Sequence, residues 1–140
     1  MTEKNKLIEK YHSNQESNIY FLMAVSASAI GFAFTQAKVE PLTLNHASLA
    51  LALALWAASF YCGNESIQWS TSFVKKNADY LSPNFFPELT ENQKITLIQS
   101  SAEHHSKKII LHSRMQNHLL ILGAFSYSTF HILSMLSVSA

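Results

Sequence analysis

The sequence predicts an all-α membrane protein with three transmembrane helices and a cytoplasmic helical hairpin that extends the second and third. Three windows without a charged side chain lead to this prediction: 17–37, 41–64 and 115–140. Each is about as long as the roughly 20 residues that a helix needs to cross the hydrocarbon core. With 140 residues, 48% of them hydrophobic and 14% charged, the chain is expected to form a single helical membrane domain.

The first span is expected at about 19–37. Residues 2–30 contain neither glycine nor proline, so one rod should run from the N-terminal segment to about Gln36, and Pro41 should stop it. The second span is expected at about 45–63. Its Leu-Ala alternation from 49 to 56 resembles a strand pattern, but a bilayer leaves the backbone of a lone strand unpaired. A helix is therefore predicted here as well.

Small residues recur at helical spacing in these spans. Four of them follow one another at intervals of four in the second span, and the first span has a similar pair: Ala50, Ala54, Ala58 and Cys62, with Ala27 and Gly31. Small side chains allow helices to approach closely in a membrane. They are therefore candidate helix-packing positions, either between the helices of one chain or between copies in a homo-oligomer.

The cytoplasmic hairpin is expected at about 64–116. The second helix should continue to Leu81, and the prolines within 82–87 should break it. Thr90 and Gln93 have the spacing of a capping box, which places a helix start at about Glu91. No glycine or proline follows until Gly123, so this helix should run directly into a third span at about 117–138.

A heptad-like seam runs along the third helix at alternating spacings of three and four. Its members become more polar toward the membrane: Ile95, Ile98, Ala102, His105, Ile109, His112, Gln116 and Leu119. Two arrangements fit this seam. In the first, the seam faces other copies of the chain, and His105, His112 and Gln116 form polar rings at a pore mouth. In the second, the seam faces the second helix within one hairpin.

Candidates for chemistry are few. The seven histidines lack the three- or four-residue spacing of a helical metal site, so no metal is expected, and phosphate-binding loops and zinc motifs are absent. No cofactor is predicted. His131, in the outer half of the third span, either lines a pore or makes a contact inside the bundle. Arg114 and His118 lie one turn apart at the edge of that span, as weak catalytic candidates or as an interfacial pair.

The basic residues predict the orientation. Three precede the first span, one lies between the first and second, six lie between the second and third, and none follows the third. The positive-inside rule places the N-terminus and the hairpin in the cytoplasm and the C-terminus outside. With a net charge of only +1, the chain offers no basic field for nucleic acid, and no direct nucleic-acid binding is expected.

This plan resembles the small membrane effectors of prokaryotic anti-phage systems. It is similar to SLATT-type effectors and to the transmembrane accessory protein of type VI CRISPR systems, which carries an Arg/His pair discussed as HEPN-like. Arg114 and His118 are the residues that match. HEPN-type ribonucleases separate the pair by four to six residues, whereas three intervene here and Met115 stands at the usual polar position. The resemblance implies oligomers that breach or depolarise the inner membrane.

The sequence therefore predicts a homo-oligomeric, multi-pass protein of the prokaryotic inner membrane that permeabilises or depolarises it as the effector of a defence system. Its expected partners are the lipid bilayer, other copies of itself and a cytoplasmic protein of the same system. One alternative is a non-enzymatic immunity protein or adaptor that binds a partner in the membrane. The other is a membrane-bound HEPN-like ribonuclease, which would need both Arg114 and His118.

Overall fold

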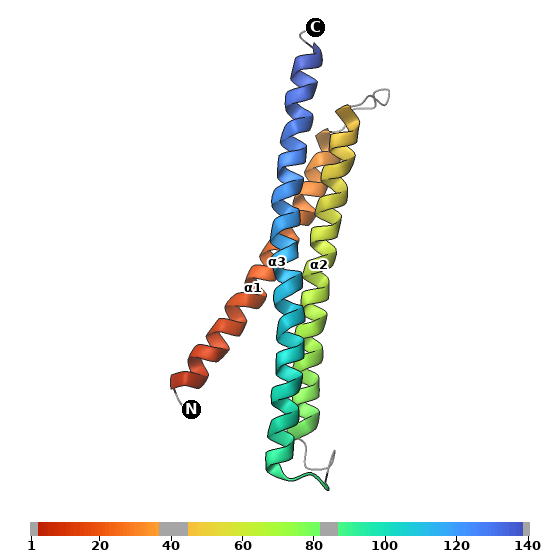
Figure 1. Cartoon of the computed structure of the whole chain (residues 1–140). Coiled ribbons are helices and arrows are strands. Elements are labelled where there is room, and N and C mark those ends of the chain that lie inside the picture. Colours follow the sequence, from red (N-terminus) through yellow and green to blue (C-terminus); the bar gives the residue numbers. More distant parts are fainter. Residues whose placement is uncertain (1–2, 37–44, 82–86, 139–140) are drawn as a thin grey trace.

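The chain folds into three long helices in a computed structural model that describes residues 3–36, 45–81 and 87–138. They are α1 (Glu3–Gln36), α2 (Asn45–Leu81) and α3 (Glu91–Val138) (Figure 1). All three are long and apolar enough to cross a membrane by length and composition. The prediction of an all-helical chain with three candidate transmembrane helices is confirmed.

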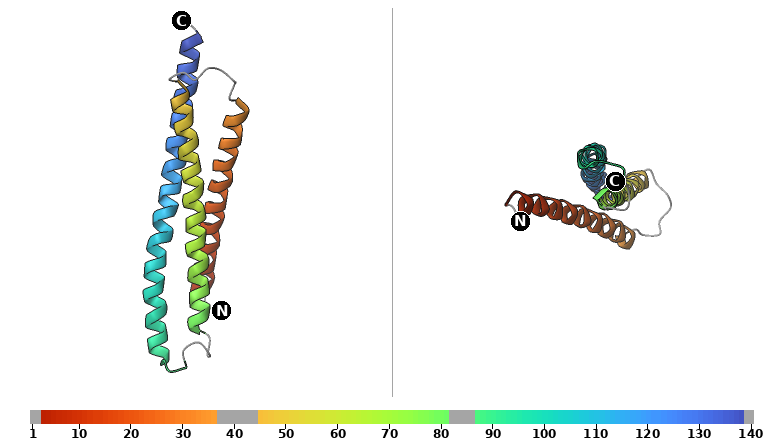
Figure 2. Two further views of the ribbon diagram at one scale, coloured as in Figure 1. Left: turned by 90° about the vertical axis from the view of Figure 1, so that its right-hand side faces the viewer. Right: turned by 90° about the horizontal axis from the view of Figure 1, so that it is seen from below.

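Helices α2 and α3 form a long antiparallel hairpin, and α1 crosses it at an angle. The C-terminal half of α1 lies beside α2, whereas its N-terminal half diverges from the hairpin (Figures 1 and 2). Most contacts of α1 are with α2, and few are with α3. The hairpin is therefore the main body of the fold, and α1 is attached to it along part of one side.

The hairpin follows two matching seams. Positions in α2 that are buried or half-buried repeat at spacings of three and four: Leu49, Ala52, Trp56, Ser59, Gly63, Ser66, Ser70, Phe73, Asn77 and Tyr80. The seam predicted on α3 faces them, with His105 and Gln116 buried and Ile109 half-buried. A repeat that averages 3.5 residues keeps the same face of each helix toward its partner, as in a coiled coil.

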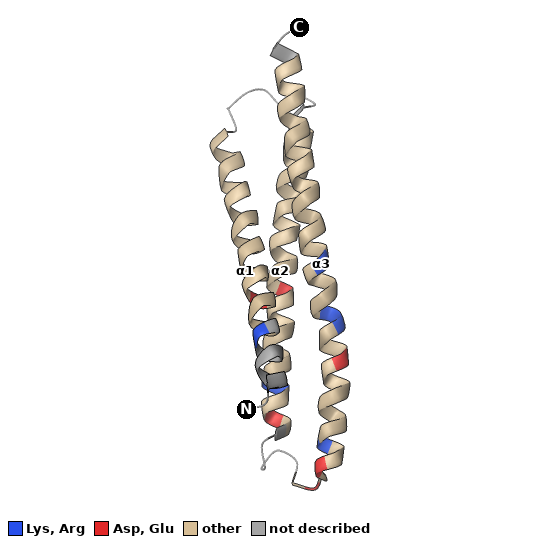
Figure 3. Cartoon of the chain, turned by 90° about the vertical axis from the view of Figure 1, so that its left-hand side faces the viewer, with Lys and Arg blue, Asp and Glu red and all other residues tan. Residues whose placement is uncertain are grey.

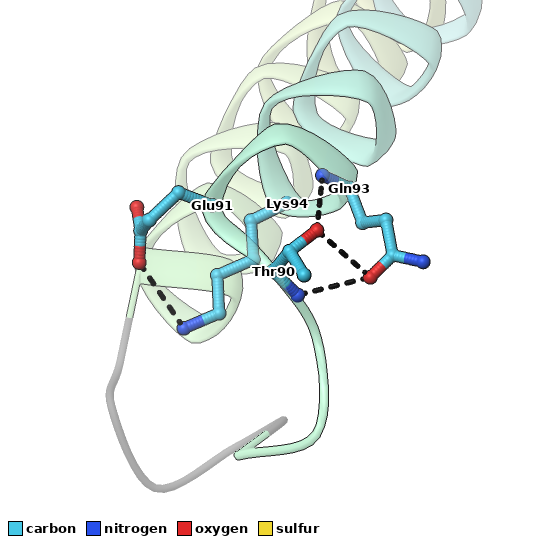
Figure 4. Close-up of polar contacts among 4 residues, drawn as sticks. All are labelled: Thr90, Glu91, Gln93 and Lys94. Carbon is cyan, nitrogen blue, oxygen red and sulfur yellow. Dashed lines mark hydrogen bonds and ion pairs between the residues drawn. The ribbon is translucent and has the colours of Figure 1, made fainter.

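The start of α3 has the predicted capping box (Figure 4). The Thr90 amide donates to Gln93 Oε1 at 2.9 Å, and the Gln93 amide donates to Thr90 Oγ1 at 3.4 Å. The helix then begins with a hydrogen bond from the Lys94 amide to the Thr90 carbonyl at 3.0 Å. Each side chain thus satisfies a backbone donor that the first turn leaves unpaired.

Several predicted turn features lie outside the described residues. They are the stop at Pro41, the short connection around Lys38 and most of the break within 82–87. The predicted helix ends on either side can be compared, and α1 ends at Gln36 and α2 at Leu81 as expected.

The apolar core lies at the end of the bundle where the described parts of the three helices carry no charge. Ala33, Leu49, Ala52 and Trp56 form its buried cluster. Alanine at 33 and 52 lets α1 approach α2 closely, while the Trp56 indole reaches across to α3 and donates from Nε1 to the Leu120 carbonyl at 3.3 Å. The Leu-Ala run is therefore helical, as predicted, and only one of its faces enters the core.

Candidate functional site

Among the residues that the structure describes, charged side chains lie at one end of the bundle (Figure 3). Along the described helices, the last charge of α1 before its uncharged segment is Glu16, that of α3 is Arg114, and the first charge of α2 is Glu65. The three uncharged segments that the sequence singles out therefore lie side by side. They form one uncharged half of the bundle, and the hairpin extends from it as a charged half.

A buried polar network joins all three helices where the two halves meet. Ser59 Oγ donates to the Gln116 carbonyl at 2.8 Å, and Ser26 Oγ lies 3.2 Å from Ser59 Oγ. Gln116 Nε2 donates to the Ile19 carbonyl at 3.2 Å. Ser26, Ser59 and Gln116 are each 0% exposed. Polar groups shielded from water need such partners, so the network fixes how α1 sits on the hairpin.

The network requires a glycine beside it. A Cβ at Gly63 would lie 2.5 Å from Gln116 Nε2 and 2.6 Å from Met23 Cγ. A Cβ at such distances would force one of these side chains to shift, so Gly63 lets the amide of Gln116 and the side chain of Met23 meet over α2. Gln116 Oε1 has no hydrogen-bond partner among the described residues.

Further hydrogen bonds cross between α2 and α3 along the seam. Ser66 Oγ donates to the Ile109 carbonyl at 3.3 Å, and Ser126 Oγ donates to the Ser48 carbonyl at 2.8 Å. Both use a hydroxyl on one helix and a backbone oxygen on the other. They bring the two backbones close together on either side of the network.

Of the two arrangements considered for the α3 seam, the structure has the one within the chain. His105 is 2% exposed, and it packs against Trp69 and Phe73 of α2 with ring centroids 5.6 and 5.8 Å apart. Gln116 is held by α1 and α2 as described above. His112 is half-buried. Because His105 and Gln116 are covered by the chain itself, in this packing they do not face a lumen between symmetry mates.

His131 is half-buried and packs against aromatic neighbours on its own helix. Its ring meets Tyr127 edge-on at 4.6 Å and Phe130 at 5.5 Å, and Tyr127 packs in turn on Trp56 at 5.5 Å. These two ring contacts of His131 lie within α3, and Tyr127 links them to α2. Both interpretations of His131 stay predictions from the sequence.

The small residues singled out by spacing lie mostly outside the helix contacts. Ala27 and Gly31 of α1 and Ala50 and Ala54 of α2 are exposed, and Ala58 is half-buried. A Cβ added at Gly31 would meet nothing within 4 Å. Packing within the chain therefore uses other small residues, and these faces remain open to lipid or to another copy.

Arg114 and His118 do not form a distinctive pair. His118 Nδ1 lies 2.7 Å from the Arg114 carbonyl, and both residues are exposed. His105 and His112 make the same contact with the carbonyl four residues earlier, at 2.7 and 2.8 Å. The contact at His118 thus recurs at other histidines of this helix. The ribonuclease hypothesis stays a prediction from the sequence.

No protein-family model, curated protein or solved structure matches the chain. The resemblance to anti-phage membrane effectors therefore stays an expectation from the sequence. Within the described residues, no group of three or more His, Cys, Asp or Glu side chains could hold a metal ion.

The electrostatic features of the charged half are local. Lys107 Nζ donates to Glu103 Oε1 at 2.8 Å, and this hydrogen bond lowers the pKa of the Glu103 carboxyl. Both groups are exposed, and such pairs contribute little to stability. Lys108 Nζ lies 5.9 Å from the centroid of the Trp69 ring.

Sequence reasoning missed the serines of the network. Ser59 and Ser66 lie in phase with Trp56 and Gly63, and this pattern of spacings of three and four was available in the sequence. Ser26 lies seven residues from both Ile19 and Ala33, which are buried as it is, so its phase on α1 was available as well. Its partner Ser59 was not.

Proposed function

We propose that the chain is a homo-oligomeric inner-membrane protein that permeabilises or depolarises the bilayer as the effector of a prokaryotic defence system. The observation that carries this proposal is the outward position of the small-residue faces of α1 and α2. Ala27 and Gly31 on α1 and Ala50 and Ala54 on α2 are exposed on the chain, although they have the spacing of helix-packing positions.

In lipid, exposed faces of small residues are the places where helices associate. Apolar side chains gain nothing by leaving lipid for one another, so helices associate there through close packing of small residues. The face of α1 around Ala24 and Ser28 is slightly hollowed between Phe21 and Phe32. A helix of a second copy can approach the α1 backbone there more closely than it could over large side chains.

In this proposal the path for ions lies between chains. Ser128 and Thr129 of α3 are exposed in the uncharged half and bond to the carbonyls of Ala124 and Phe125 at 2.9 and 3.0 Å. Hydroxyls satisfied within their own helix tolerate lipid and can also face water. Assembly can therefore place them along a path without breaking the fold of the single chain.

A second candidate function is binding of a partner protein, as an immunity protein or adaptor. Exposed apolar side chains on the charged half of the hairpin favour it, notably Val74 at 61% and Leu111 at 52% exposure. Apolar groups that face water beyond the spans are typical of a docking surface. Purified chain in liposomes separates the two functions, because only the effector releases trapped dye without a partner.

Gly31→Leu tests self-association. We expect self-association to weaken about tenfold, equivalent to about 1.4 kcal/mol, and dye release to fall with it, because the larger side chain blocks the approach of a second helix. The fold should be retained, since a Cβ at this position meets nothing within 4 Å. The measurements are the mass of the assembly in detergent and dye release from liposomes.

Ala78→Leu is the matched control, because it enlarges an exposed small residue of α2 in the charged half, away from both small-residue faces. Its assembly mass and dye release should equal those of the original chain. A monomeric original chain that releases no dye, or a Gly31→Leu variant that assembles and leaks as before, would contradict the proposal.

A further inference from the structure

A cavity of about 590 Å³ lies between α1 and the hairpin, at the start of the charged half. Its lining comes from all three helices and includes Glu16 of α1, Ser70 and Phe73 of α2, and Ser106 and Ile109 of α3. This volume falls within the roughly 300–1,000 Å³ that is usual for small-molecule sites. The cavity lies where the N-terminal half of α1 begins to diverge from the hairpin (Figure 1).

The two walls of the cavity differ in chemistry. The hairpin contributes mainly apolar side chains, among them Phe73, Val74 and Ile110. From α1 come mainly polar ones, including Ser13, Gln15 and Glu16. A ligand that fits both walls is amphipathic, with an apolar part against the hairpin and a polar part against α1.

The charged side chains of the lining indicate which charge the polar group of the ligand carries. Among the described residues, one carboxylate, Glu16, and one imidazole, His12, line the cavity, and no lysine or arginine lines it. Glu16 Oε1 accepts a hydrogen bond from Ser70 Oγ at 3.1 Å, which joins the two walls. A carboxylate can accept about four hydrogen bonds, so Glu16 retains capacity for a cationic donor. The ligand therefore carries a cation.

The position of the cavity indicates that the ligand comes from the bilayer. Ile19, at its inner end, is buried in the first turn of the uncharged segment of α1, three residues beyond Glu16. In the membrane-embedded chain proposed above, this is the level of the lipid headgroups. A lipid can enter sideways from the bilayer between α1 and the hairpin without leaving its leaflet.

We infer that this cavity binds a phospholipid with a primary ammonium headgroup, of the phosphatidylethanolamine type. Its ammonium lies at Glu16, and the first part of an acyl chain lies against Phe73 and Ile109. The hydroxyls of Ser13 and Ser106 are donors suited to the phosphate oxygens. This inference rests on the proposed membrane location but not on self-association or permeabilisation.

The test is native mass spectrometry of the full chain in detergent, titrated with dioleoyl phosphatidylethanolamine, phosphatidylcholine or phosphatidylglycerol. We expect one phosphatidylethanolamine per chain, bound at least about tenfold more tightly than the other two lipids. The choline group carries a charge but no N–H donor, and the glycerol headgroup lacks a cation. Glu16→Gln should remove the preference, and Ser106→Phe should prevent binding of all three lipids by filling the cavity.

Glu103→Gln is the matched control, because Glu103 is an exposed carboxylate of the same hairpin outside the cavity. It should keep the preference for phosphatidylethanolamine. Equal binding of the three lipids, or a preference that survives Glu16→Gln, would overturn the inference. Gly31→Leu separates it from the proposed function, since that variant should lose dye release and still bind the lipid.

Discussion

Gly123→Ala is expected to lower the free energy of unfolding of the helical bundle in detergent by about 1–3 kcal/mol. A Cβ at Gly123 would lie 2.5 Å from both Cδ1 and Nε1 of the Trp56 indole. The indole cannot move aside cheaply, because it is buried, bonds to the Leu120 carbonyl and packs on Tyr127. The substitution therefore has to push α3 away from α2. Thermal unfolding followed by circular dichroism measures the loss.

Gly31→Ala provides the control for this substitution. The same change is made inside a helix, but the new Cβ meets nothing within 4 Å. Alanine favours a helix over glycine by up to about 1 kcal/mol, so this variant should be as stable as the original chain or slightly more so. Trp56→Phe combined with Gly123→Ala should recover part of the loss. Equal melting temperatures for the two alanine variants would contradict the packing of α2 on α3.

Gly63→Ala is expected to detach α1 from the hairpin. The new Cβ would collide with Gln116 Nε2 and Met23 Cγ, so the amide would leave the Ile19 carbonyl. Overpacking of this kind typically costs about 1–3 kcal/mol, and the collision with Met23 falls between α1 and α2, where most contacts of α1 lie. The hairpin itself should survive, because the bonds from Ser66 and Trp56 lie outside the collision.

Spin labels at Phe34 and Leu51 report this detachment, because both positions are exposed, one on α1 and one on α2. Pulsed electron paramagnetic resonance should show a longer and broader distance distribution in Gly63→Ala. The native Cys62 is buried and should stay unlabelled. In Gly31→Ala the distribution should match that of the original chain. An unchanged distribution in Gly63→Ala would show that the network does not position α1.

The helices themselves were accessible to sequence reasoning because their causes are local. The capping box at Thr90 and Gln93 predicted the start of α3, and the absence of glycine and proline predicted its uninterrupted run past Arg114. A helix was predicted for the Leu-Ala run because a lone strand in lipid would leave its backbone unpaired. These predictions needed no knowledge of which helix meets which.

The face that each helix buries was harder to predict. A spacing of four, as from Ala50 to Ala54 and Ala58, drifts by about 40° per step around a helix with 3.6 residues per turn. It therefore starts outside the interface, where Ala50 and Ala54 are exposed, and reaches it at Cys62, whereas alternating spacings of three and four stay on the interface throughout. Leu49, Ala52 and Trp56 follow that alternation and are buried.

The partners of the polar side chains depend on the packing of distant segments. Gln116 bonds to the carbonyl of Ile19, which lies 97 residues earlier in the chain. Nothing local to Gln116 distinguishes this partner from a symmetry mate. The seam alone therefore left both arrangements open, and the divergence of α1 that forms the cavity at Glu16 had no signal in the sequence.

The central claim is that lipid surrounds the uncharged half of the bundle, and cysteine labelling in isolated membranes tests it most directly. Leu51 and Gln99 are both exposed on the chain, Leu51 in the uncharged half of α2 and Gln99 in the charged half of α3. Single cysteines are placed at each position and treated with a water-soluble maleimide in opened membranes. The account predicts labelling of Gln99→Cys and none of Leu51→Cys until detergent and denaturant are added. Equal labelling of both positions in intact bilayers would contradict it.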